Sequence, residues 1–130
     1  MDSGVSLDAI ISGGERVPPQ GVRIDVAFEG HTTGRLTGQL RGIDYLRFRA
    51  DGRIDLDIRA MLETNDGHRI ALSADGVAVP RTSEPIADLS VNHCLSTTAE
   101  DYAWVNAKQI WAFGTVDFST GKIHVDAYLQ

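Results

Sequence analysis

Cysteine is almost missing from this chain of 130 residues, and long apolar runs and a basic leader are missing altogether. The single Cys94 excludes an internal disulfide and is typical of proteins in reducing compartments. No apolar run approaches the ~20 residues that a membrane-spanning helix needs. The first residues also lack the basic and apolar segments of a secretory signal. These absences predict a cytoplasmic protein that does not bind membranes.

Positive charge is also scarce, because 12 Lys and Arg stand against 18 Asp and Glu, for a net charge of −6. Proteins that bind nucleic acids usually carry a basic stripe that neutralises phosphates. The local group of arginines between residues 41 and 53 is interrupted by Asp44 and Asp51. We therefore expect no nucleic-acid partner.

Motifs of nucleotide-dependent and serine-hydrolase chemistry are absent as well. The chain has no phosphate-binding loop, no dinucleotide fingerprint and no G-x-S-x-G turn. Its four histidines are scattered, without the spacing of metal ligands: His31, His68, His93 and His124. We predict neither a metal site nor a cofactor.

What the sequence does contain is a regular alternation of apolar and polar residues. Between Ile54 and Leu62 every second residue is apolar, which is the pattern of a β-strand between two environments. The pairs Asp51-Gly52 and Asp75-Gly76 and the triplet Asn65–Gly67 are strong signals for hairpin turns.

Similar segments recur along the chain, with turn signals roughly every 8–12 residues. The expected strands cover 22–28, 32–40, 44–50, 53–64, 68–79, 91–97, 103–118 and 122–129. Residues 1–20 are expected to form an arm or edge strand that ends in a turn at Pro18-Pro19, and residues 83–89 one helical turn. The sequence thus predicts one all-β domain over residues 1–130. Its expected architecture is an antiparallel, up-and-down, lipocalin-like barrel of about eight strands.

Asp57 and Arg59 lie on one face of the expected strand 53–64 and are the candidate catalytic residues. If this face lines the interior, the carboxylate is a candidate general base and the guanidinium can polarise a substrate oxygen. In the alternative, the apolar residues of the same strand fill the interior and this pair lies in water.

Trp104 and Asn106 are two residues apart, so on a strand they share a face. An indole platform beside an amide would suit a flat, partly oxygenated ligand, although a core tryptophan and a loop-binding asparagine explain the pattern equally well. Tyr45, His93 and Tyr102 complete the predicted ligand-binding set. Trp111 and Phe113 have the opposite parity to Trp104 and predict an outer apolar surface of a homodimer.

A series of short motifs carries a family resemblance: residues 34–38 (GRLTG), 42–45 (GIDY), 51–52 (DG), 57–59 (DIR), 64–67 (TNDG) and 102–106 (YAWVN). In this order they resemble the domain-of-unknown-function family 3237, small β-barrels found mostly in bacteria. The resemblance covers about residues 30–114. It implies a closed or nearly closed barrel with a ligand-sized interior. It also implies a precedent in fungal members for cofactor-free cyclisation of polyketide-type products.

Three functions follow from these observations. The first is binding of a small apolar or aromatic oxygenated molecule, with cofactor-free isomerase, cyclase, hydratase or other lyase chemistry through Asp57 and Arg59. The second is a non-catalytic carrier or sensor for such a molecule. The third is a homodimeric accessory protein with no ligand. A substitution that abolishes turnover while binding survives would separate the first from the second.

Overall fold

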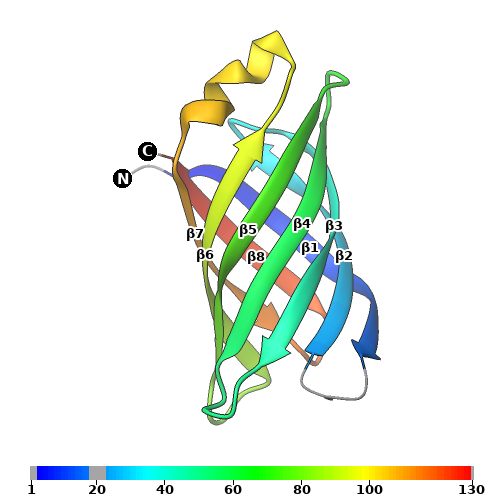
Figure 1. Ribbon diagram of the computed structural model, residues 1–130, viewed down its shortest axis with the longest axis vertical. Helices are drawn as coiled ribbons and strands as arrows, with labels where there is room; N and C mark the ends of the chain where they lie inside the picture. The colour runs from blue at the N-terminus through cyan, green and yellow to red at the C-terminus, as the bar shows by residue number, and fades with distance from the viewer. Residues whose placement is uncertain (1–2, 18–22, 130) are drawn as a thin grey trace.

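The chain forms a closed antiparallel β-barrel of eight strands, in which each strand pairs with the next and the last returns to the first (Figure 1). A computed structural model describes residues 3–17 and 23–129. The strands are β1 (Ser3–Val17), β2 (Arg23–Gly34), β3 (Gly38–Phe48), β4 (Ile54–Thr64), β5 (Arg69–Pro80), β6 (Ile86–Ser96), β7 (Ile110–Asp117) and β8 (Lys122–Leu129). One short 3-10 helix, η1 (Glu100–Ala107), lies between β6 and β7. The prediction of an up-and-down barrel is confirmed.

Two of the predicted hairpin turns lie where the sequence signals them. Gly52 and Gly67 both have a φ of 89°, a left-handed conformation that glycine adopts at no steric cost. The first turn is closed by a hydrogen bond from Arg49 N to Arg53 O (2.9 Å), the second by one from Thr64 N to His68 O (2.8 Å). These turns set the register of β4 against both of its neighbours.

The alternation within each strand separates an apolar interior from a polar exterior. On β4, Ile54, Leu56 and Leu62 are buried, whereas Asp57 and Arg59 are exposed. The same parity on all eight strands forms one continuous core. For strand β4, the apolar face fills the interior, as the second of the two alternatives expected.

Asp75-Gly76 is not a turn, contrary to expectation, but lies within the uninterrupted strand β5. Gly76 pairs with Val91 of β6, and a Cβ atom at position 76 would collide with the carbonyl oxygen of Ser90. The glycine therefore permits a close approach of two backbones. This is a packing requirement that a dipeptide signal does not distinguish from a turn.

Four further segments differ from the expected elements. Residues 32–40 are not one strand, because β2 runs on to Gly34 and the chain turns before β3 begins at Gly38. Residues 100–107 form η1 instead of an extended segment, and β6 already begins at Ile86, where a helical turn was expected. Residues 3–17 form a full strand that pairs with β2 on one side and β8 on the other. The expected Pro18-Pro19 turn lies outside the described residues.

Helix η1 lies at one end of the barrel (Figure 1). Its Val105 is fully buried and belongs to the common core, so the helix packs on the barrel through this side chain. In the described part of the chain, no helix has the length and apolar character needed to cross a membrane.

Candidate functional site

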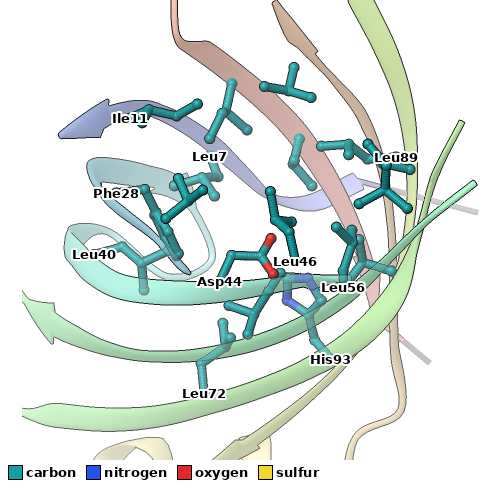
Figure 2. A pocket seen from close by; sticks show the side chains of 18 of the residues that line it. Leu7, Ile11, Phe28, Leu40, Asp44, Leu46, Leu56, Leu72, Leu89 and His93 are labelled. Atoms are coloured by element: carbon teal, nitrogen blue, oxygen red, sulfur yellow. The ribbon is translucent and has the colours of Figure 1, made fainter. Parts of the chain in front are cut away.

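The barrel encloses a cavity of about 90 Å³ whose wall is apolar except for two side chains, Asp44 and His93 (Figure 2). A second cavity of about 50 Å³ adjoins it, and His93 lines both. Drug-sized ligands usually fill pockets of about 300–1,000 Å³. The interior can therefore hold a few water molecules or a small organic group.

Asp44 comes from β3 and points inward, as its strand neighbours Leu40 and Leu46 do (Figure 2). Its Oδ1 accepts a hydrogen bond of 3.2 Å from the backbone N–H of Asp57 on β4. Burial is the main reason why the pKa of Asp44 rises from 3.8 to about 7; the bond from Asp57 lowers it and the charge of Asp57 raises it. Near neutral pH the carboxyl is thus present in both protonated and ionised forms, able to donate or to accept.

His93 comes from β6, where it pairs with Ala74 of β5 and Ile110 of β7. Burial lowers the pKa of this imidazole from 6.5 to about 4, so the ring is neutral at pH 7. A neutral imidazole has one N–H donor and one nitrogen acceptor. Among the described residues, no hydrogen bond joins His93 to Asp44, so both side chains keep polar atoms for a third group.

Thr32 adds a third polar group to the interior. It lines the smaller cavity together with His93, and its buried Oγ1 has no hydrogen-bond partner in the described part of the chain. An unpaired buried hydroxyl is unfavourable by about 1–3 kcal/mol. The interior therefore contains more polar groups than hydrogen-bond partners for them among the described residues.

Asp57 and Arg59, the predicted catalytic pair, do not line this cavity. They lie on the outer face of β4, 56% and 61% exposed, and form an ion pair of 3.0 Å between Asp57 Oδ1 and Arg59 Nη1. The physical reason is parity: the apolar residues of β4 occupy the interior, which places these two in water. Of the two alternatives left open for this pair, the structure has the one in which both side chains lie in water.

Four of the five predicted ligand-binding residues also lie away from the cavity. Tyr45 is on the outside of β3, 5.1 Å from the guanidinium of Arg23. Tyr102 donates through its hydroxyl to the carboxylate of Asp66 at 2.9 and 3.0 Å. That contact is the main reason why the pKa of Tyr102 is raised.

Trp104 and Asn106 do not share a strand face, because both belong to helix η1. The Trp104 ring packs on the core and stacks 4.3 Å from the guanidinium of Arg35. Asn106 binds Thr97 twice, accepting from its N–H (2.9 Å) and donating to its carbonyl (3.1 Å). The loop-binding alternative for Asn106 is the one that the structure has. Of the predicted set, His93 alone lines the cavity.

Sequence reasoning missed Asp44, although a signal was present. Leu40, Gly42, Asp44 and Leu46 share one parity, so a strand running from Gly38 places Asp44 on the apolar face. The expected strand began only at Asp44, and this hid the pattern. An acidic residue in register with leucines is the feature that identifies a carboxyl on the cavity face.

Metal chemistry finds no support in the geometry of these side chains. Within residues 3–17 and 23–129, no group of three or more His, Cys, Asp or Glu side chains is placed to hold a metal ion. The site is therefore described by Asp44, His93 and Thr32 in an apolar wall.

The fold and the site together define the class of protein: a closed eight-stranded β-barrel around a small apolar cavity. The chain belongs to the family described as protein of unknown function DUF3237, whose profile matches residues 5–129. This confirms the resemblance seen in the motifs. No curated protein matches the chain.

Solved structures share the fold at low sequence identity. A conserved protein of unknown function from Rhodopseudomonas palustris has a TM-score of 0.83 at 17% identity, covering 98% of this chain and 93% of its own. A protein with unknown function from Clostridium acetobutylicum has a TM-score of 0.86 at 15% identity, covering 98% and 94%. An enzyme from Penicillium herquei has a TM-score of 0.60 at 17% identity, covering 98% and 96%. At these identities the likeness establishes the fold alone.

Proposed function

We propose that the barrel binds a small, mostly apolar molecule with one or two oxygen functions, and that Asp44 and His93 form hydrogen bonds with it. The observation that carries the proposal is Asp44, a carboxyl group set in an otherwise apolar wall with one backbone N–H as its protein partner. Burying such a group is unfavourable unless it is hydrogen-bonded. Strongly perturbed carboxyls in cavities are concentrated at functional sites.

The same pair suits cofactor-free proton transfer. A carboxyl with a pKa of about 7 can give a proton to a substrate oxygen and, in its ionised form, take one from another substrate atom, while the neutral His93 can hold the substrate through hydrogen bonds. Such a transfer leaves the atomic composition of the substrate unchanged. It therefore fits isomerisation, cyclisation by addition of a hydroxyl across a double bond, or the reverse elimination. General acid–base catalysis of this kind typically contributes ~10²–10⁴-fold in rate. The fold is compatible with catalysis, since the Penicillium herquei protein is an enzyme.

The proton-transfer role that the sequence suggested for Asp57 thus moves to Asp44. Asp57 keeps an indirect influence, because its amide binds the Asp44 carboxylate and its charge raises the pKa of Asp44. A non-catalytic carrier is the second candidate function, since the cavity and its polar groups serve binding alone equally well.

The test compares ligand binding and turnover in the wild type, Asp44→Asn and the control Glu63→Gln, which makes the same change on the outer face of β4 away from Asp44. A thermal-shift screen would use small phenols, aromatic ketones, terpenoid alcohols and lactones. A ligand at ~100 times its dissociation constant stabilises the folded state by about 2.7 kcal/mol, which is several degrees in Tm.

For an enzyme, Asp44→Asn retains a ligand shift but loses turnover, while Glu63→Gln retains both. A carrier gives a ligand shift and no turnover in any of the three proteins. If none of the compounds shifts Tm in the wild type, the binding proposal is wrong and the accessory function becomes the leading candidate.

A further inference from the structure

The wall of the barrel is interrupted between β3 and β4, directly beside Asp44. Pairing runs from Gly38↔Thr64 to Asp44↔Ile58 and resumes at Arg47↔Asp55, with no paired residues between. On the other side of β4, pairing with β5 is continuous from Ile54 to Glu63. We call the four unpaired residues, Tyr45, Leu46, Leu56 and Asp57, the β3–β4 gap.

In this gap a side chain makes the contact between the strands that backbone pairing makes elsewhere. The amide of Asp57 donates to Asp44 Oδ1 at 3.2 Å, so a cavity carboxyl spans the two strands. A ligand can replace a side-chain contact of this kind without breaking the backbone hydrogen bonds of the neighbouring pairs. The gap is therefore a part of the described wall where the strands can separate without the loss of a paired position.

Outside the gap lies a groove of about 540 Å³ across β2, β3 and β4. Leu56 lines both this groove and the inner cavity, so the two hollows meet at one residue. The volume of the groove is several times that of the cavity. A molecule too large for the cavity alone would have room for its remaining part here.

The groove carries three arginines beside the carboxylates of Asp55 and Asp57, and two of the arginines are already paired. Arg23 binds Asp25 (2.9 Å) and Arg59 binds Asp57 (3.0 Å). Arg47 is exposed and makes no ion pair or side-chain hydrogen bond with the described residues, although it lines the same groove. A guanidinium binds oxyanions through paired, charge-assisted hydrogen bonds.

We propose that groove, gap and cavity are one site for an amphiphilic organic acid, with its anionic head on Arg47 and its apolar body passing Leu56 into the barrel. The proposal rests on the proposed binding function and specifies its ligand class and access route. It explains why the gap lies between Arg47, the groove cation that has no ion pair with the described residues, and Asp44 in the cavity wall, the two polar ends of such a path.

The head-group test uses three matched probes: 4-phenylbutyrate, its neutral alcohol 4-phenylbutanol, and 4-phenylbutyl phosphate. Calorimetric Kd values are measured for the wild type and Arg47→Gln. The matched control is Arg41→Gln, which removes the same charge from the outer face of the same strand. We expect the wild type and Arg41→Gln to bind an anionic probe about tenfold more tightly than the alcohol. Arg47→Gln should lose this preference while its affinity for the alcohol is retained.

Each outcome decides a different point. Preference for the butyrate identifies a carboxylate ligand, and preference for the phosphate identifies a phosphate ester. Binding of the alcohol without any anion preference, or a preference that survives in Arg47→Gln, overturns this inference and leaves the proposed function intact. Failure of all three probes to bind also overturns this inference, whereas the thermal-shift screen decides the proposed function.

The access route is tested by closing the gap with a disulfide. Tyr45→Cys and Asp57→Cys, made in a Cys94→Ser background, place two thiols on the outer faces of the gap. The control pair, Gln39→Cys and Glu63→Cys, joins the same strands at a paired position. We expect oxidation of the gap pair to slow probe association by about tenfold or more relative to its reduced form, and no such change in the control pair. Equal rates in the oxidised and reduced gap variants would rule out this route.

Discussion

The backbone amide of Asp57 donates a hydrogen bond of 3.2 Å to the carboxylate of Asp44, across the gap between β4 and β3. The two acidic residues face opposite sides of the wall: the Asp57 side chain is in water and the Asp44 side chain lines the cavity. One strand thus supplies a solvated ion pair and, through its backbone, a partner for the cavity carboxyl. This relationship connects the outer groove to the proposed chemistry inside.

Asp44 makes the stability of the protein depend on pH in a defined direction. Its folded-state pKa of about 7 lies above its ordinary 3.8, so the folded protein holds the proton more tightly than the unfolded chain does. The stability that this group contributes is complete below about pH 4 and is lost as pH rises to about 7, by at most about 4 kcal/mol. Asp44→Asn should therefore be more stable than the wild type at pH 8 and lose that advantage near pH 4. Urea unfolding across this range measures the difference, and equal curves at all pH values would contradict it.

His93 acts in the opposite direction. Its pKa of about 4 lies below its ordinary 6.5, so its contribution is present above about pH 6.5 and is lost as pH falls toward 4. The loss amounts to at most about 3 kcal/mol. We expect His93→Leu to retain more of its stability than the wild type between pH 6 and pH 4, as measured by unfolding at each pH. Because the two trends oppose each other in the wild type, each is visible only as the difference from its variant. A His93→Leu profile parallel to that of the wild type would show that the pKa of His93 is not lowered in the folded protein.

Gly76 tests the closeness of the β5–β6 contact. An added Cβ would meet the carbonyl oxygen of Ser90, which is fixed in the strand and cannot yield as a flexible side chain would. Gly76→Ala should therefore lower the free energy of unfolding by about 1–3 kcal/mol, the usual effect of overpacking. Ser73→Ala, on the outer face of the same strand, serves as the control and should change it by less than about 0.5 kcal/mol. A fully tolerated Gly76→Ala would indicate a wider spacing between these strands.

The exposed aromatic side chains on the outer face of β7 predict that the protein forms a homodimer. Trp111 and Phe113 are 43% and 51% exposed, and Phe113 lies 6.2 Å from the ring of Tyr128 on β8. The expected homodimer would bury this surface, because exposed aromatic pairs are typical of protein interfaces. Sedimentation equilibrium should give a dimer for the wild type and a monomer for Trp111→Lys. A wild type that stays monomeric at high concentration would refute the prediction.

The sequence alone determined the class of fold, because its signals are local. The alternation from Ile54 to Leu62 and the glycines at positions 52 and 67 fix strand periodicity and turn geometry within a few residues. Short loops between such strands lead to an antiparallel meander, and the family motifs lie along the same stretch. The predicted ligand-binding set also contained one residue that lines the cavity, His93.

Only the tertiary structure decided which polar residues face the interior. The two parities of a strand are equivalent until the barrel closes, which here requires β1 to pair with β8 across more than 100 residues of sequence. Closure turned Asp57 and Arg59 outward and Asp44 inward, and it made Gly76 a contact point instead of a turn. Burial, which raises the pKa of Asp44 and lowers that of His93, is a property of the closed barrel and of no single segment.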